Sequence, residues 1–314
     1  MTVPADAGVA SLPTGVELAF ETYGEPSGRP LLLIMGLGGP GLWWSNELCA
    51  DLAGRGFYVI RYDNRDIGRS TYFEQHRVPR RRIAQAFLGR RRGLPYTLAE
   101  MADDACGLLD HLGVRQAHVC GASMGGMIAQ TMAIAHPARV RSLVSMMATT
   151  GRRNVGWQDP RLLSLLFRRP QHSREDYVAN SGRVWGALSS PQFTEDTALL
   201  EQRARETWDR GVDAAGAMRQ LVAVVTQPDR TEALRSLRIP VLVIHGSRDR
   251  MVHPSGGRAT ARAVPGAELM VIPGMGHDLP TQLHGVFADA IQRTADRAGV
   301  RSAREAQQVE QRAR

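Results

Sequence analysis

The chain has 314 residues, and 43% of them are hydrophobic, which is enough for one large buried core. Its formal net charge at pH 7 is +8 and all 39 basic residues are arginine, a bias that points first to a GC-rich coding sequence. Because no zinc finger, RRM or basic-zipper pattern accompanies this charge, we expect no nucleic-acid partner.

The cysteines and the N-terminus bear on the compartment. Cys49, Cys106 and Cys120 are odd in number and widely spaced, so neither a disulfide framework nor a zinc site is indicated. The first 15 residues have neither the basic nor the apolar region of a signal peptide, and no run of about 18 apolar residues occurs. We therefore expect a protein of the reducing cytoplasm that is not exported and spans no membrane.

Six short apolar runs, most of them followed by a glycine or polar turn, predict strands that are buried on both faces. They are LLLIMG (31–36), FYVIRYD (57–63), AHVCGAS (117–123), LVSMMAT (143–149), VLVIHG (241–246) and LMVIPG (269–274). Helices are predicted between and after them, at 43–54, 97–112, 124–136, 255–263 and 281–297. This alternation predicts an α/β fold with a mainly parallel, doubly wound sheet.

Two segments, 72–96 and 151–236, interrupt the alternation and contain no apolar strand. Insertions of this kind usually carry function or cover a site. We expect residues 1–150 and 237–298 to form the core, and residues 151–236 to form a helical lid inserted in it. Residues 299–314 have almost no large apolar side chain and are expected to form a flexible tail, either a frayed helix or disordered.

The third apolar run ends in the motif G-x-S-x-G, with Ser123 between Gly121 and Gly125. So short a motif also occurs by chance, but here it lies where a buried strand turns into a helix. Such a turn holds the serine in a strained backbone conformation and leaves room only for glycine two positions before and after it. The serine oxygen is then exposed above the carboxyl edge of the sheet. This context favours a nucleophile over the alternative, a Gly-rich turn that only packs the helix.

A serine nucleophile needs a general base and an acid that orients this base. Asp249 and His277 each follow one of the last two predicted strands, so the three candidates occur at strand ends in the order Ser, Asp, His. Asp249 also fits a helix cap, and His277 also fits a surface histidine. Asp278 is the least favoured substitute acid, because neighbouring side chains on a loop seldom face each other. His245 lies within a strand, and we interpret it as a hydrogen-bonded core residue.

The loop after the first predicted strand reads IMGLGGPG, residues 34–41. Its glycines let the backbone bend toward the serine, so the Leu37 N–H and the Met124 N–H are the predicted donors to an oxyanion. The alternative is a plain Gly-rich turn. A phosphate-binding loop is not indicated, because neither G-x-x-x-x-G-K-[ST] nor G-x-G-x-x-G occurs here.

With these motifs, residues 15–298 resemble the α/β-hydrolase superfamily. The blocks LLIMGLGG, VIRYDNRDIGRST, MADDACGLLDHLG, CGASMGGMIAQ, PVLVIHGSRD and IPGMGHDLP are similar to actinobacterial esterases and lipases of the lipase G type and, more distantly, to anthracycline methyl esterases. The resemblance implies hydrolysis of carboxylic esters, with phospholipase or thioesterase activity in some members. It also implies Ser123 as nucleophile, His277 as general base, Asp249 as its orienting acid, and Leu37 and Met124 as oxyanion donors.

The chain departs from the broader superfamily at two places and shares one further block with it. Many members have His-Gly before the oxyanion residue where this chain has Met35-Gly36, which keeps the backbone donor but removes a polar contact. The nucleophile position is Ser rather than Asp, which disfavours dehalogenase and epoxide-hydrolase chemistry. The block Asp-Asn-Arg-Asp at 63–66 is expected to be a structural, ion-paired turn below the site.

The two insertions each allow two interpretations. The lid carries the aromatic residues Trp157, Phe167, Trp185, Phe193 and Trp208. They are expected either to line an apolar acyl pocket or to pack the lid on the core, and Trp157, Trp185 and Trp208 are the candidate pocket residues.

The segment RVPRRRIAQAFLGRRR, Arg77 to Arg92, has seven arginines around a few apolar residues. It predicts either a solvated basic loop with one short packed helix or an interfacial helix on an anionic membrane.

The function predicted from these residues is that of a serine hydrolase that cleaves a carboxylic ester through an acyl-enzyme, with no metal or organic cofactor. The expected partner is a small-molecule or lipid-like ester. Other chemistry on the same triad remains open: thioesterase, phospholipase, C–C hydrolase, perhydrolase or acyltransferase. A binding protein that kept the fold and lost catalysis, and a nucleic-acid-binding role drawn from the charge, are the further alternatives.

Overall fold

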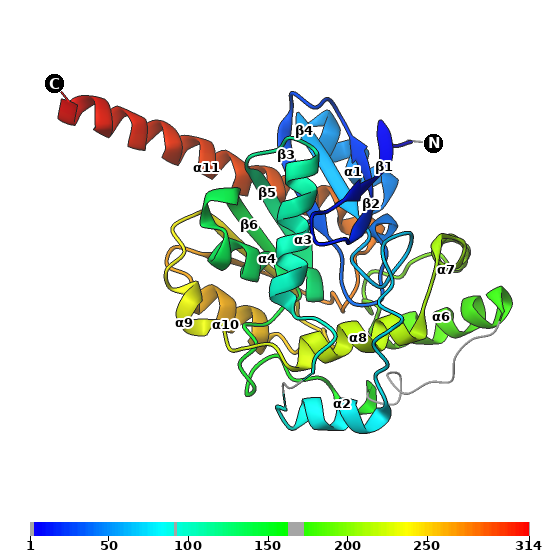
Figure 1. Ribbon diagram of the computed structural model, residues 1–314. Coiled ribbons are helices and arrows are strands. Elements are labelled where there is room, and N and C mark those ends of the chain that lie inside the picture. The colour runs from blue at the N-terminus through cyan, green and yellow to red at the C-terminus, as the bar shows by residue number, and fades with distance from the viewer. Residues whose placement is uncertain (1–2, 91–92, 163–172, 314) are drawn as a thin grey trace.

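The computed structural model describes residues 3–90, 93–162 and 173–313, and these build one eight-stranded sheet with helices on both faces (Figure 1). The strands are β1 (Asp6–Ser11), β2 (Glu17–Tyr23), β3 (Arg29–Ile34), β4 (Phe57–Tyr62), β5 (Ala117–Ala122), β6 (Val140–Met146), β7 (Val241–Gly246) and β8 (Glu268–Ile272). Their spatial order is β1-β2-β4-β3-β5-β6-β7-β8. The strands from β3 to β8 are parallel, and β2 is antiparallel to both of its neighbours.

All six predicted strands are present, which confirms the α/β class and the mainly parallel, doubly wound sheet. The hairpin of β1 and β2 is not among the predicted strands. Most of β1 is exposed or half-buried, so its sequence lacks the continuous apolar run of a buried strand. Its strand conformation depends on pairing with β2, in a register from Asp6 opposite Thr22 to Ser11 opposite Glu17.

Two helical layers cover the sheet. One contains α1 (Asn46–Gly54) and α11 (His284–Ala313), and the other contains α3 (Leu98–His111), α4 (Met124–Ala135), α9 (Thr231–Leu234) and α10 (Ser255–Ala263). Successive strand side chains alternate between these layers: Leu32 of β3 and Val119 of β5 pack on the α4 side, whereas Leu33 and Cys120 pack on the α1 side. The central strands are therefore buried on both faces, as their apolar runs predict.

The five predicted helices are also present, and the last of them is longer than predicted. The sequence predicts an end near residue 297, whereas α11 continues to Ala313. The segment after 297 is poor in large apolar residues but rich in Ala, Arg, Glu and Gln, which favour helix without tertiary contacts. In Figure 1 this end of α11 projects away from the body of the molecule. Across the described ranges, no helix has the length and apolar character needed to cross a membrane.

The two insertions lie together at the carboxyl ends of the parallel strands. The second insertion forms α6 (Arg174–Leu188), α7 (Thr197–Arg210) and α8 (Ala214–Val225), which we call the cap helices, after the short turn η3 (Pro160–Leu162). The first forms α2 (Arg80–Phe87), which lies on the outer side of α8 in Figure 1. Ile83 and Ala86 of α2 pack against Leu221 and Val222 of α8. The division into a core and a separately inserted lid remains a prediction.

Candidate active site

Ser123 occupies a sharp turn between β5 and α4. Its backbone angles are φ 57° and ψ −120°, which a residue with a side chain adopts only under strain. A Cβ atom at Gly121 would lie 2.1 Å from the Gly125 carbonyl oxygen, and one at Gly125 would lie 2.0 Å from the Ile34 carbonyl oxygen. The strand, the helix and the neighbouring β3 loop therefore meet so closely that both positions require glycine, as the motif predicts.

The structure brings Ser123, His277 and Asp249 into one hydrogen-bonded chain. The His277 Nε2 atom is 2.9 Å from Ser123 Oγ, and His277 Nδ1 is 2.8 Å from Asp249 Oδ2. Because the Asp249 carboxylate can only accept, Nδ1 carries the proton and Nε2 is left to accept the hydroxyl proton of Ser123. All three side chains come from turns that follow parallel strands: Ser123 follows β5, Asp249 follows β7 and His277 follows β8.

The Asp249 carboxylate is fully buried and held from several sides. Its Oδ1 accepts hydrogen bonds from the Met251 and Val252 N–H groups, both at 2.9 Å. Burial opposes ionisation, but attraction to His277 and hydrogen bonds from His245 and His277 together hold the pKa of Asp249 below its ordinary value. Asp249 is therefore ionised at neutral pH and its orientation is fixed before a substrate arrives.

His245 lies beside Asp249, and its interpretation as a fully hydrogen-bonded core residue is wrong at one nitrogen. Its Nε2 lies 2.8 Å from the Val252 carbonyl oxygen and 3.2 Å from Asp249 Oδ2, so it donates toward two acceptors. Its Nδ1 is buried and has no hydrogen-bond partner among the described residues. Gly257, which has no side chain to offer as a partner, packs against this nitrogen. His245 is the penultimate residue of β7 and Asp249 lies in the turn that follows this strand, so the two residues are close along the chain.

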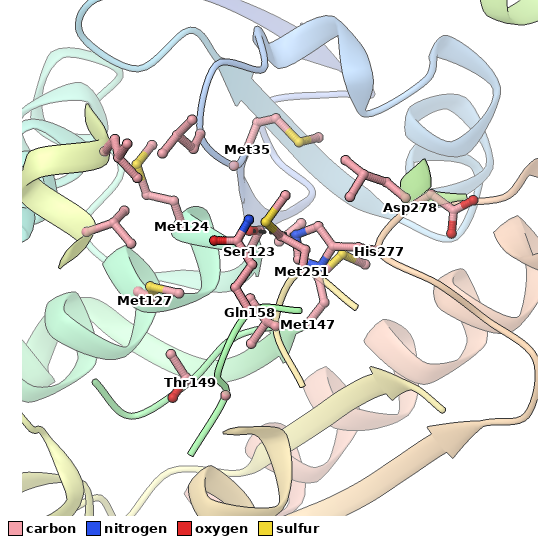
Figure 2. Close-up of a pocket in the computed structure, with 18 of the residues that line it drawn as sticks. Met35, Ser123, Met124, Met127, Met147, Thr149, Gln158, Met251, His277 and Asp278 are labelled. Atoms are coloured by element: carbon pink, nitrogen blue, oxygen red, sulfur yellow. Dashed lines mark hydrogen bonds between the residues drawn. The ribbon is translucent and has the colours of Figure 1, made fainter. Parts of the chain in front are cut away.

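Asp278 turns away from His277, the predicted general base. Its carboxylate accepts hydrogen bonds from the Ser190 N–H at 2.9 Å and the Ser190 hydroxyl at 2.5 Å, and Figure 2 shows it directed away from Ser123. Burial raises the pKa of Asp278, an effect that the hydrogen bonds from Ser190 reduce but do not cancel. The His277 N–H also donates to the Leu188 carbonyl, at 2.8 Å. The C-terminal end of α6 thus holds the loop that carries His277.

The loop at residues 34–41, which is the predicted oxyanion loop, passes close to the serine. A Cβ at Gly36 would lie 3.6 Å from Ser123 Oγ. Within the described residues, the N–H groups of Leu37 and Met124 donate to no protein acceptor, and Met124 begins a helix whose first N–H groups have no internal partner. The loop is fixed by Asn64 Nδ2, which donates to the Met35 carbonyl at 2.9 Å.

A second anchor of the oxyanion loop comes from the cap and has no signal in the sequence. Gln220 of α8 is fully buried, and its Oε1 accepts the Gly38 N–H at 2.8 Å. Its Nε2 donates to the Arg65 carbonyl at 2.7 Å. One amide side chain therefore joins the cap, the oxyanion loop and the turn at 63–66.

The turn at 63–66 is ion-paired, as its composition predicts, but two of its partners lie in the cap. Arg65 binds Asp104 of α3 through two hydrogen bonds of 2.6 and 2.7 Å. Asp66 binds Arg219 of α8 through two of 2.8 and 2.7 Å. Asp63 binds Arg210 at the end of α7, at 2.7 Å. The turn thus fastens the cap to the sheet.

A cavity of about 640 Å³ lies between the sheet edge and the cap, and Ser123 and His277 line it. Five methionines surround the serine in it (Figure 2): Met35, Met124, Met127, Met147 and Met251. Methionine side chains adapt to irregular apolar shapes, so this lining suits a bulky apolar group. In the described part of the chain, no group of three His, Cys, Asp or Glu side chains is arranged to hold a metal ion.

The candidate pocket aromatics divide between the cavity and the packing of the cap. Trp157 and Trp185 line the cavity. Trp208 is not among the lining residues and instead packs on Tyr177, with ring centroids 5.6 Å apart, because its face of α7 is turned toward α6. Trp43, which is not a predicted pocket residue, lines the cavity with its ring edge-on to Trp185 at 4.8 Å. Phe193 packs in the core beside α11, and Phe167 lies outside the described residues.

Comparison with known proteins decides the family. Residues 29–280 match the family model described as the alpha/beta hydrolase fold. The chain belongs to the α/β-hydrolase fold family. It is 32% identical over 301 residues to the rhodomycin D methylesterase DauP of Streptomyces sp. (strain C5), which covers 88% of this chain and 94% of that protein. It is 27% identical to the putative non-heme bromoperoxidase BpoC of Mycobacterium tuberculosis H37Rv, over 83% of this chain and 91% of that protein.

Solved structures of the same fold agree. A hydrolase from Pseudomonas aeruginosa PA01 superposes with a TM-score of 0.71 at 23% identity, over 92% of this chain and 98% of the other. A thermophilic esterase from Thermogutta terrifontis gives a TM-score of 0.65 at 24% identity, over 93% and 100%. The expected membership of the α/β-hydrolases and the likeness to methyl esterases are confirmed. The closer likeness to lipase G type esterases stays a prediction.

Two polar groups in the lining of this α/β-hydrolase cavity, Gln158 Nε2 and Thr149 Oγ1, are buried without a hydrogen-bond partner among the described residues. In Figure 2 the amide end of Gln158 points toward Ser123. An unpaired amide in such a place costs free energy unless a bound molecule accepts its hydrogen bond.

Proposed function

We propose that this protein hydrolyses carboxylic esters through an acyl-enzyme formed on Ser123. The observation that carries the proposal is the continuous chain of hydrogen bonds from Ser123 Oγ through His277 to the buried Asp249, at 2.9 and 2.8 Å. A serine hydroxyl is a useful nucleophile at neutral pH only when a base oriented in this way accepts its proton. The relatives that are named methylesterases support the same reaction class.

The proposed reaction has two halves. In the first, Ser123 Oγ attacks the ester carbonyl while His277 Nε2 takes its proton, and Asp249 stabilises the resulting imidazolium. The negative charge on the former carbonyl oxygen is met by the N–H groups of Leu37 and Met124, and His277 returns the proton to the departing alcohol. In the second half, water attacks the acyl-enzyme, His277 takes a proton from it, and Ser123 leaves with that proton as the acid is released.

For the substrate we propose an ester of a bulky apolar acid with a small alcohol. The cavity of about 640 Å³ and its methionine lining support a large apolar acyl group. Gln158 Nε2 would donate to a carbonyl or hydroxyl oxygen of that group, close to the reacting ester. A fully apolar acyl chain would leave this amide unpaired, so we expect a preference for acyl groups with one polar atom near the ester.

The test is hydrolysis of methyl and p-nitrophenyl esters with acyl groups of increasing size, by the parent protein and by Ser123→Ala. We expect the variant to lose about a thousandfold or more in kcat. Ser236→Ala, an exposed serine at the opposite end of the sheet, is the matched control and should match the parent. Equal turnover by the parent and Ser123→Ala would contradict the proposal, as would two inert proteins across the whole panel.

The same assay separates the other chemistries on this triad. Thioesters of the same acids test thioesterase activity, and product analysis in the presence of an added alcohol or of hydrogen peroxide tests acyl transfer and perhydrolysis. We expect free acid to be the dominant product in each case. A new ester or a peracid as the main product would replace hydrolysis by the corresponding transfer reaction.

A further inference from the structure

Among the described residues, exposed side chains of the cavity lining show where the cavity reaches the protein surface. Of the described residues that line it, four are exposed: Phe87, Arg152, Arg153 and Trp157. Phe87 ends α2, and the other three belong to the loop that follows β6. The two segments touch, since a Cβ at Gly89 would lie 2.2 Å from a guanidinium nitrogen of Arg153. The mouth of the cavity therefore lies between α2 and residues 151–157.

Large apolar side chains are exposed around this mouth. Phe87 is 43% exposed, Leu88 is 76% exposed and Trp157 is 52% exposed. The packing of α2 on α8 does not need them, because Ile83 and Ala86 already fill that contact. Single exposed apolar residues are ordinary, but three that surround the entrance of one cavity mark an interaction site.

The charge around the mouth is positive and uncompensated. Residues 75–99 contain seven arginines and no acidic residue, so this one segment accounts for all but one of the +8 net charges of the chain. Five arginines of the described mouth region are exposed and take part in no ion pair with a described residue: Arg77, Arg81, Arg90, Arg152 and Arg153. Some exposed arginines elsewhere on the surface do have acidic partners, as in the pairs Arg235–Glu232 and Arg250–Asp159.

We propose that this mouth surface, defined by Phe87, Leu88 and Trp157 with the five exposed arginines, docks on an anionic phospholipid bilayer. Aromatic and leucine side chains enter the boundary between head groups and acyl chains, while arginines bind the phosphates. An acidic protein would match the charge but would leave no reason for the exposed apolar groups, which a bilayer takes up. An ester dissolved in the lipid would then enter the cavity directly, without passing through water.

Docking requires no turnover, so the experiment uses the full chain with Ser123→Ala and is independent of the proposed esterase activity. The protein is sedimented with vesicles of phosphatidylcholine alone or mixed with phosphatidylglycerol, at low salt and at about 0.5 M salt, where the Debye length falls to a few ångströms. We expect binding only to the anionic vesicles, with most of it lost at high salt. No binding to anionic vesicles at low salt would overturn the proposal.

Paired variants then test whether the mouth surface itself is responsible. Arg81→Gln with Arg90→Gln should weaken binding about thirtyfold, because each arginine near an anionic surface contributes roughly a factor of five. Arg115→Gln with Arg238→Gln removes two exposed arginines at the opposite edge of the sheet, before β5 and β7, and should leave binding nearly unchanged. Equal losses from both pairs would show a nonspecific charge effect and contradict docking at the mouth.

The apolar contribution has its own matched pair. Leu88→Ser should weaken binding several-fold, whereas Val9→Ser, an exposed apolar residue of the edge strand β1, should not. Neither Leu88, Arg81 nor Arg90 lines the cavity, so in the catalytically intact chain hydrolysis of a soluble ester should be unaffected by these changes. If these variants lost both the hydrolysis of a soluble ester and the binding to vesicles, the changes would have damaged the fold. The assignment of binding to the mouth surface would then be contradicted.

Discussion

The catalytic edge of the sheet and the cap helices are positioned in different ways. At the edge, Ser123, Asp249 and His277 lie in turns that directly follow β5, β7 and β8, so strand order alone brings them together. The cap depends on charged pairs between distant residues: Arg210 with Asp63 and Arg219 with Asp66, which are 147 and 153 positions apart. The first arrangement follows from local patterns, and the second follows only from tertiary structure.

The cap nevertheless contacts two loops of the candidate site, the one that carries Leu37 and the one that carries His277. Gln220 holds the oxyanion loop, and the backbone of Leu188 with the side chain of Ser190 holds the loop of His277 and Asp278. If these contacts matter for the reaction, the cap is part of the catalytic framework as well as a cover. The following predictions separate the two regions, from the largest expected effect to the smallest.

The largest effect is expected from Asp249, in comparison with Asp278, the carboxylate next to His277 in the sequence. Asp249→Asn should lower kcat by about ten-thousandfold, because an amide cannot hold His277 with its proton on Nδ1. Asp278→Asn should cost far less, since Asp278 binds Ser190 and makes no hydrogen bond to the catalytic ring. Steady-state hydrolysis of a soluble ester measures both. Comparable losses of kcat in the two variants would mean that Asp278, which the cap holds, is as important for the reaction as Asp249.

The next effect concerns the attachment of the cap. Arg219 is 2% exposed and Asp66 is fully buried, so Arg219→Met leaves a buried carboxylate without its charged partner. We expect a loss of about 3 to 5 kcal/mol in the free energy of unfolding, measured by denaturant titration. Arg174→Met breaks the exposed pair with Asp209 and should leave the unfolding midpoint almost unchanged. A small effect of Arg219→Met would show that the cap does not depend on this pair.

This contrast also explains what the sequence allowed us to predict. Apolar runs and the spacing of Ser123, Asp249 and His277 predicted the central strands and the candidate triad, because burial and strand ends leave local signals. In the hairpin, β1 was missed because an edge strand lacks the apolar run of a buried one, and β2 was missed because Glu21 and Thr22 interrupt its apolar residues.

The rest of the site depends on which helix faces touch. Trp43 lines the cavity and Trp208 does not, and nothing in their local sequences distinguishes them. Gln220 looks like any polar residue of a helix until α8 is placed against the oxyanion loop. Likewise, the turn at 63–66 shows its charges in the sequence but not that two of its partners come from the cap.

The next prediction concerns the pH dependence of the free energy of unfolding, which a buried histidine of the sheet should change. Burial, with smaller contributions from Arg141 and Arg29, lowers the pKa of His118 on β5 from 6.5 to about 4. As the pH falls through this interval the unfolded chain binds a proton that the folded chain does not, so stability decreases with decreasing pH. We expect this one histidine to cost about 3 kcal/mol by pH 4.

The matched variant is His118→Asn, which keeps a polar atom near Ser142, the hydrogen-bond partner of His118 Nδ1 at 2.8 Å. Chemical unfolding at several pH values from 7 to 4 gives the comparison. The parent should lose stability relative to the variant only below about pH 6.5. A constant difference across this range would show that His118 does not titrate differently in the folded and unfolded chains.

The smallest effect tests directly whether the cap contributes to catalysis. Gln220→Met removes the cap anchor of the oxyanion loop, and Asn64→Leu removes its core anchor at the Met35 carbonyl. Each loses hydrogen-bond stabilisation of about 1 kcal/mol, so we expect each to lower kcat by roughly fivefold. Because the loop donor acts on the oxyanion more strongly than on the bound ester, KM should change little. If only Asn64→Leu lowers kcat, the cap covers the site without supporting its chemistry, and the catalytic edge is complete without it.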